Sequence, residues 1–306
     1  MTDELDRTAD PVDPGDPTDA ADRADSNRDV RSRAFVPGHV TGFFSPYPDD
    51  NSRAAGSRGA GIALEEGVEV SVEPSDDGQR SIHSTLNGDP TRIEPVESVL
   101  AELDVQAHVE IETTLPVGAG FGVSGAAALG TALAANDAFG CGRSENDLIA
   151  IAHVAEVEAG TGLGDVVAEA RGGIPIRLEP GAPGYGSLDG VPANARVEYV
   201  SFGELSTASI LSEDTAGLSA AGERALSTLQ SDSTLPVLFE TSRTFAREAG
   251  LLVPEVAEAI DLVEAAGGEA AMGMLGRTVI ALDAGLSEAG YDPDITRVHP
   301  GGARLR

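Results

Sequence analysis

Residues 115–136 decide the fold, and they read LPVGAGFGVSGAAALGTALAAN. The preceding segment 108–114, HVEIETT, alternates apolar and polar residues, which is typical of a strand. After Gly125 the sequence is rich in Ala and Leu and has no Pro, so it favours a helix. The stretch therefore predicts a strand, a glycine-rich turn and a helix in succession.

The glycine-rich turn has the features of an anion site. Gly118, Gly120 and Gly122 carry no Cβ, so the backbone can bend sharply and approach a ligand closely. Ser124 stands at the expected helix start, where its hydroxyl could cap the helix or bind a metal. The free N–H groups and the positive dipole end there favour phosphate. A tight strand-to-helix connection without a ligand is the alternative interpretation.

Two familiar phosphate motifs can be tested against this turn. A Walker loop needs Gly-Lys-Ser/Thr, and the chain contains no lysine, so that motif is excluded. Residues 120–125 do fit the spacing G-x-G-x-x-G. A dinucleotide fold, however, needs a second strand after the helix, whereas here a glycine break at 139–142 leads into another helical segment, 145–158. The dinucleotide interpretation is therefore the weaker one.

The composition limits the partners and the compartment. The 306 residues include 51 Asp and Glu against 20 basic residues, all of them Arg, and the net charge is −31. Such acidity argues against nucleic acid as a partner and suits a salty cytoplasm, where salt screens the repulsion. A single cysteine, Cys141, excludes an internal disulfide and agrees with a reducing compartment. We expect no membrane partner, because no apolar stretch approaches about 20 residues and the start is acidic.

The order of predicted elements indicates an α+β fold. Residues 1–29 are acidic and poor in apolar side chains, so we expect them to be disordered. The remaining pattern predicts strands, turns at 37–46 and 65–67, a loop at 179–195, and a domain boundary near residue 200. The strands are expected at 33–36, 62–64, 68–73, 81–86, 108–114, 174–177 and 196–202, the helices at 93–103, 147–158, 219–230, 235–249 and 254–266, and a hairpin at 271–282.

Two carboxylates bracket a second glycine-rich turn, 159–164. Phosphoryl transfer needs carboxylates to hold Mg²⁺ and to orient or deprotonate the acceptor hydroxyl, so Glu156 and Asp165 are candidates for these roles. Taken alone, Asp165 could simply cap a helix, and Glu156 could be a charge on a helix surface. His153 lies one turn before Glu156, but two ligands without a third favour packing over metal binding.

Four further residues could bind a small acceptor. His39 lies between glycines in a predicted turn, where it could bind a ligand or simply bond to nearby backbone. Ser57 lies in the glycine cluster 56–61, which could admit a ligand or form a β-bulge. Arg177 could clamp a carboxylate or form a surface ion pair. Thr207 lies in a polar turn after the strand 196–202.

Taken together, these motifs resemble those of the GHMP kinases (galacto-, homoserine, mevalonate and phosphomevalonate kinases). Residues 116–127, PVGAGFGVSGAA, resemble the phosphate loop P-x-x-x-G-L-G-S-S-A-A of that family. The segment from Glu156 to Asp165 resembles the region of its Mg²⁺-binding glutamate and catalytic aspartate, and Pro37-Gly38-His39 resembles its N-terminal motif. More narrowly, four segments resemble the archaeal branch that phosphorylates pantoate on the route to coenzyme A: AFVPGHVTGFF, GSRGAGIAL, AHVAEVEAGTGLGDVVAEARGG and AMGMLG.

The resemblance implies a role for each candidate. ATP would lie on a loop formed by Pro116, Gly118, Gly120, Gly122, Ser124 and Gly125. Ser124 and Glu156 would hold Mg²⁺, and Asp165 would orient the primary hydroxyl of pantoate. Arg177 would pair with the pantoate carboxylate, while His39, Ser57 and Thr207 would line the acceptor pocket.

The family also implies a fold of two domains and a homodimer. The first domain, like domain 2 of ribosomal protein S5, would span 30–200, and a ferredoxin-like domain would span 201–306. This chain departs from the family pattern in three places. Val123 replaces the first of two serines, the N-terminal lysine of some members is missing, and the third motif is reduced to Gly267-Gly268-Glu269 and 273–276. A homoserine or mevalonate type of kinase, or a nucleotide-binding regulator without activity, are the alternatives.

Overall fold

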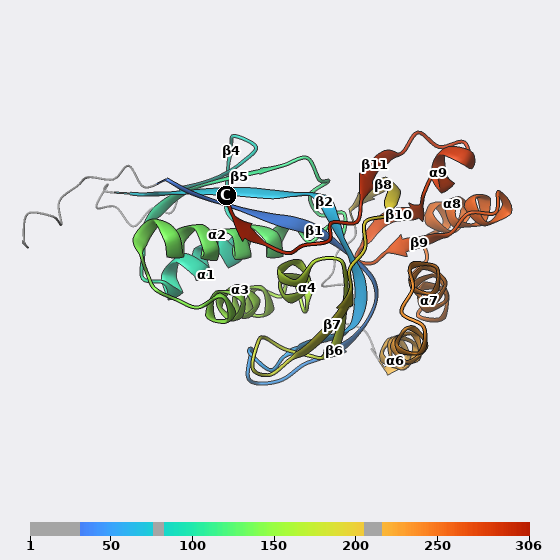
Figure 1. The fold of residues 1–306 in the computed structure, drawn as a ribbon, viewed down its shortest axis with the longest axis horizontal. Helices are drawn as coiled ribbons and strands as arrows, with labels where there is room; N and C mark the ends of the chain where they lie inside the picture. Colours follow the sequence, from blue (N-terminus) through green and yellow to red (C-terminus); the bar gives the residue numbers. More distant parts are fainter. Residues whose placement is uncertain (1–30, 76–82, 205–215) are drawn as a thin grey trace, which may run out of the picture. The chain divides into compact units, whose positions relative to one another are not determined.

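The computed structural model describes residues 31–75, 83–204 and 216–306, which belong to one compact unit spanning 31–306. The expectation for residues 1–29 and the role predicted for Thr207 lie outside the described residues. The described chain contains two sheets and several helices, as an α+β fold requires (Figure 1).

The first sheet is built on a long antiparallel hairpin of β1 (Ser32–Tyr47) and β2 (Gly56–Pro74). The strand order is β12-β1-β2-β5-β3-β4, and β6 and β7 extend from the first half of β2. Only the β3–β5 pair is parallel among these strands. Their bounds are β3 His83–Leu86, β4 Asp89–Thr91, β5 Ala107–Thr113, β6 Ile174–Glu179, β7 Ser187–Val191 and β12 Arg304–Leu305.

The turns expected at 37–46 and 65–67 are wrong, because both segments lie inside long strands. The register of the β1–β2 pair shifts between Pro37 and His39 and again between Thr41 and Phe43. Glycines of β2 lie where the two backbones approach closely: a Cβ at Gly67 would clash with the carbonyl of Val36. Here Gly and Pro mark irregular pairing within a strand and not its end.

A group of helices lies on one side of the first sheet (Figure 1). They are α1 Glu94–Glu102, α2 Val123–Phe139, α3 Glu145–Ala159 and α4 Asp165–Arg171. Helix α2 lies on β1 and β2 and is buried on most sides, so it lacks the apolar stripe of a surface helix. Ser144 and Asp147 form a capping box that begins α3. The predictions of helices at 93–103 and 147–158 are confirmed.

The second sheet has the order β11-β8-β10-β9. Its strands are β8 Arg196–Glu204, β9 Ala270–Gly273, β10 Gly276–Leu282 and β11 Asp294–Arg297. The helices of this part are α6 Ala216–Ser231, α7 Leu235–Glu248, α8 Pro254–Ala265 and α9 Gly285–Glu288. The predicted hairpin and the three longer helices are confirmed, while the boundary near residue 200 falls within β8 and stays a prediction.

Within the described ranges, no helix combines the length and the apolar character that crossing a bilayer requires.

Candidate active site

The glycine loop, residues 115–122, connects β5 to α2. Gly118, Gly120 and Gly122 have φ angles of 76°, 86° and 69°, so all three need the left-handed conformation that glycine adopts without strain. Gly122 is the N-cap of α2, and no side chain caps the helix there. The first N–H groups of α2 are therefore left for a ligand.

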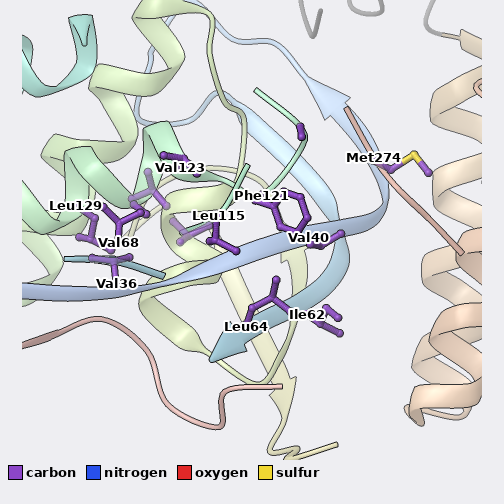
Figure 2. Packing of buried hydrophobic residues seen from close by; sticks show 14 of the residues in the cluster. Val36, Val40, Ile62, Leu64, Val68, Leu115, Phe121, Val123, Leu129 and Met274 are labelled. Carbon is purple, nitrogen blue, oxygen red and sulfur yellow. The ribbon is translucent and has the colours of Figure 1, made fainter. Parts of the chain in front are cut away.

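Apolar side chains anchor this loop in the core. Leu115, Phe121 and Val123 are buried, and Figure 2 shows them gathered beside Val36 and Val40 of β1. The backbone N–H of His39 donates to the carbonyl of Phe121 at 3.0 Å. The loop is thus held by alternating buried residues while its glycines stay at the surface of a cavity.

A cavity of about 250 Å³ lies against the glycine loop and the start of α2. Its wall contains all but one of the residues predicted to hold the phosphates, since Pro116 does not line it. Val117, Phe121 and Val123 of the same segment line it too, and the remaining wall comes from elsewhere in the chain: Thr41, Glu156, Thr161, Asp165, Met274 and Leu275. The loop motif and the two carboxylates are therefore brought to one site.

Ser124 and Glu156 form a pair inside this cavity. The Ser124 hydroxyl donates to Oε1 of Glu156 at 2.6 Å, while Oε2 is buried without a partner among the described residues. Burial raises the pKa of Glu156 to about 7; the Asp165 charge adds to this rise, and the Ser124 hydrogen bond opposes it. The glutamate is 2% exposed and is no surface charge.

This pair suits a magnesium ion that takes its other ligands from phosphate and water. Mg²⁺ commonly binds one or two protein oxygens and completes its shell in that way. In the part of the chain that the structure describes, no three His, Cys, Asp or Glu side chains form a metal cluster. The unpartnered Oε2 and the serine hydroxyl are the oxygen donors that such an ion would use.

Asp165 is the first residue of α4, and Gly164 precedes it as N-cap, so Asp165 does not cap the helix. Its Oδ1 lies 2.8 Å from Nδ1 of His39. Burial lowers the pKa of His39, so the ring is neutral near pH 7 and can donate Nδ1–H to the carboxylate. Burial also raises the pKa of Asp165, but the His39 hydrogen bond and the Arg177 charge outweigh it and lower that pKa. Asp165 therefore remains a carboxylate.

A second, smaller cavity adjoins the first at Asp165. It is lined by Thr41, Phe44, Ser57, Leu163, Gly164, Asp165, Arg177 and Leu275. Arg177 is 2% exposed, and neither Nε nor Nη1 has a partner among the described residues. Burial lowers the pKa of Arg177, and the Asp165 charge opposes this effect. A buried guanidinium with free donors is a site for an anion.

The structure separates the predicted acceptor residues. Ser57 on β2 and Arg177 on β6 line the smaller cavity together, since Arg177 lies opposite Gly59 in the pairing of these strands. His39 lines neither cavity; it is fully buried behind Asp165. Its contact with the site passes through the Asp165 carboxylate.

The reduced third motif is split between two places. The turn 273–276 lies on the glycine loop: a Cβ at Gly120 would be 2.6 Å from the carbonyl oxygen of Met274. The Thr278 hydroxyl also donates to the carbonyl of Ala119 at 3.0 Å. Residues 267–269 instead follow α8, where Gly268 packs on Val263.

Sequence reasoning missed Thr41 and Leu275, which line both cavities, and Glu169, which is fully buried beside them. Glu169 follows Asp165 by four residues, so helical spacing places the two on one face of α4. That spacing was the available signal for Glu169. Thr41 and Leu275 lie inside the segments AFVPGHVTGFF and AMGMLG, so the motifs contained both residues but assigned neither of them a role.

Comparison with known proteins defines the class. Residues 93–173 match the family model described as the GHMP kinases N terminal domain, and curated relatives are 31–36% identical over most of their length. The chain therefore belongs to the GHMP kinase family. Among its relatives is the pantoate kinase of Thermococcus kodakarensis, which is 36% identical and aligns over 82% of this chain and 87% of its own length.

Two further comparisons agree. The pantoate kinase of Methanospirillum hungatei is 34% identical over 83% of this chain and 88% of its own length. A solved structure titled "Phosphotransferase related to CoA biosynthesis pathway" superposes with a TM-score of 0.80 at 31% identity, covering 90% of this chain and 98% of that one. The resemblance to GHMP kinases drawn from the motifs is confirmed.

Proposed function

We propose that the protein transfers the γ-phosphoryl group of ATP to the primary hydroxyl of pantoate and forms 4-phosphopantoate for coenzyme A synthesis. One observation carries the choice of acceptor: the buried Arg177, whose Nε and Nη1 have no partner in the described part of the chain, lies beside Asp165 where the two cavities adjoin. A hydroxy acid presents a carboxylate to the arginine and an alcohol to the aspartate. The pantoate kinases among its relatives support the same acceptor.

The triphosphate binds to the glycine loop and the free amides at the start of α2. Ser124 and Glu156 would hold Mg²⁺, which neutralises charge on the phosphates when it is bound. Because the chain has no lysine, its own contribution to binding the transferred group rests on backbone amides and arginine.

Asp165 orients the alcohol and accepts its proton as the new O–P bond forms and the bond to the β-phosphate oxygen breaks. Its low pKa makes it a weak base, so orientation is its larger contribution. A loose transition state for phosphoryl transfer places little demand on proton removal. His39 holds the carboxylate in place, and Ser57 lines the acceptor cavity.

The proposal extends to the setting of the enzyme. The net charge of −31 supports a cytoplasm of high salt, because repulsion among carboxylates is then screened over a few Å. A homodimer is proposed from the family alone.

An assay of ATP consumption tests the function. In buffer with concentrated KCl and Mg²⁺, the protein should turn over with pantoate and not with homoserine or mevalonate. Turnover with one of those alcohols alone would overturn the acceptor, and ATP binding without turnover would indicate a regulator.

The Arg177→Ala variant tests the observation behind the acceptor. It should raise KM for pantoate by on the order of a hundredfold, since a buried charge-assisted pair is lost, and leave KM for ATP within about twofold. Equal effects on both KM values would show that Arg177 does not hold the carboxylate.

A further inference from the structure

Glu169 is a buried acid that the proposed reaction does not use. It lies one turn after Asp165 in α4, and its side chain is completely inaccessible to solvent. Neither Oε1 nor Oε2 has a hydrogen-bond partner among the described residues. Burying a polar group in this way costs on the order of 1–3 kcal/mol, which suggests that the group has a use.

The carboxyl group of Glu169 reaches the start of α2. A Cβ at Gly122 would overlap Oε1, and a Cβ at Gly125 would lie 3.2 Å from Oε2. These two glycines flank Ser124, and both line the larger cavity, whereas Glu169 does not. The carboxyl group therefore packs on the backbone of the phosphate site from behind, in space left by two missing Cβ atoms.

The surrounding charges favour an uncharged acid at this place. Burial raises the pKa of Glu169 well above its usual range, and the nearby charges of Asp165 and Glu156 raise it further. A carboxylate behind the first turn of α2 would compete with phosphate for the positive end of the helix dipole. The uncharged group leaves that field for the ligand.

We propose that Glu169 is a positioning residue that sets the start of α2 against α4, and so fixes the phosphate-binding amides relative to Asp165. This inference rests on the proposed function, because it assumes that nucleotide binds at the glycine loop. The dipole of the uncharged carboxyl group, packed against the first turn of α2, performs the role, because neither oxygen forms a hydrogen bond with a described residue.

Two variants of similar size separate polarity from charge and packing. Glu169→Gln keeps two polar atoms without a charge, whereas Glu169→Met keeps the volume without the polar atoms. We expect Glu169→Gln to bind a non-hydrolysable ATP analogue within about twofold of the unaltered protein, and Glu169→Met to bind it on the order of tenfold more weakly. In turnover, Glu169→Met should raise KM for ATP much more than KM for pantoate.

Either departure would overturn the proposal. Equal binding by both variants would mean that Glu169 only fills space, and equal loss in both would mean that its charge is required. Thermal unfolding of each variant shows whether a loss of nucleotide binding comes from misfolding. Glu198→Gln is the matched control, because Glu198 of β8 is equally buried but bonds to Arg196 of the same strand and to Ser287 of α9. The nucleotide affinity of this variant should not change.

Calorimetry measures binding of the ATP analogue without an acceptor, so its result does not depend on which acceptor the enzyme uses. If the unaltered protein binds the analogue but rejects pantoate, the function fails while the Glu169 result still stands. If the unaltered protein binds no analogue, both the function and this role are overturned.

Discussion

The imidazole of His39 is buried behind the carboxylate of Asp165, for which we propose a role in orienting the acceptor. Its Nδ1 contacts Asp165, and its Nε2 is buried without a partner among the described residues. Two substitutions can each keep one of these nitrogens. The side-chain amide nitrogen of Asn lies near the position of Nδ1, and that of Gln lies near the position of Nε2. The pair of variants therefore reports which nitrogen the reaction needs.

We expect His39→Asn to keep kcat within about tenfold and His39→Gln to lose on the order of a hundredfold, as Asp165 loses its support. Steady-state kinetics with both substrates measures this. If His39→Asn instead lost more kcat than His39→Gln and raised KM for pantoate, His39 would contact the acceptor directly, as the sequence predicts.

Glu156 makes stability depend on pH. Its pKa is about 7 in the folded protein against 4.5 ordinarily, so the native state binds the extra proton between these values. The free energy of unfolding must then fall as pH rises from about 4.5 to 7, and the fall is complete above 7.

In protein free of metal and nucleotide, Glu156→Gln should gain stability relative to the unaltered protein across that pH range. The gain should be on the order of 3 kcal/mol, as a shift of this size implies. Denaturant unfolding in EDTA at pH 5, 6 and 8 measures it, and Glu158→Gln on the exposed side of α3 serves as control. A difference that does not change with pH would contradict the prediction.

At the scale of elements, the turn between α3 and α4 joins the two cavities. A Cβ at Gly164 would lie 2.6 Å from Nε of Arg177 and 2.8 Å from Oγ of Ser57. The glycine is therefore needed for the space that it leaves to these two side chains.

Gly164→Ala should therefore raise KM for pantoate on the order of tenfold, because both acceptor side chains must move, and change KM for ATP by less than about twofold. Gly217→Ala in α6 is the control, since a Cβ there meets no atom within 4 Å. A rise in KM for ATP alone would show that this turn belongs to the nucleotide site.

Elements with a local signal were the ones that sequence could predict. The helices α1, α3, α7 and α8 follow apolar spacing, caps and prolines, which are properties of neighbouring residues. The β1–β2 hairpin was broken into turns because its glycines serve contacts with a partner strand, and such contacts are not local.

The site divides in the same way. Motif spacing predicts Ser124, Glu156 and Asp165 as site residues, and the structure brings these three residues to one cavity. The burial of Glu169 and the place of His39 behind Asp165 depend on how strands and helices assemble. No local sequence pattern predicts that a particular polar side chain will be buried.

At the scale of the whole molecule, charge dominates. With 51 acidic and 20 basic residues, the arginines can neutralise at most 20 negative charges, so a net charge of −31 and its repulsion remain even if every arginine is paired. Salt weakens both the ion pairs and the repulsion between carboxylates. Because acidic residues are in excess, the loss of repulsion is the larger effect, and salt stabilises the protein.

The melting temperature should therefore rise as KCl increases from about 0.2 M to 2 M, a range over which the Debye length falls from about 7 Å to about 2 Å. Differential scanning calorimetry measures it, with NaCl at equal ionic strength as a comparison. A melting temperature that falls with KCl would mean that the arginine pairs outweigh the repulsion.

The contact between the turn 273–276 and the glycine loop has a consequence for synthesis of the chain. The glycine loop, for which we propose phosphate binding, is translated more than 150 residues before Thr278, whose hydroxyl holds Ala119. A nascent chain released near residue 200 would carry the whole phosphate motif without the surface that closes it. Kinase competence would thus require chain well beyond the motif, so a fragment that ends near residue 200 should be inactive although it carries every residue of the glycine loop.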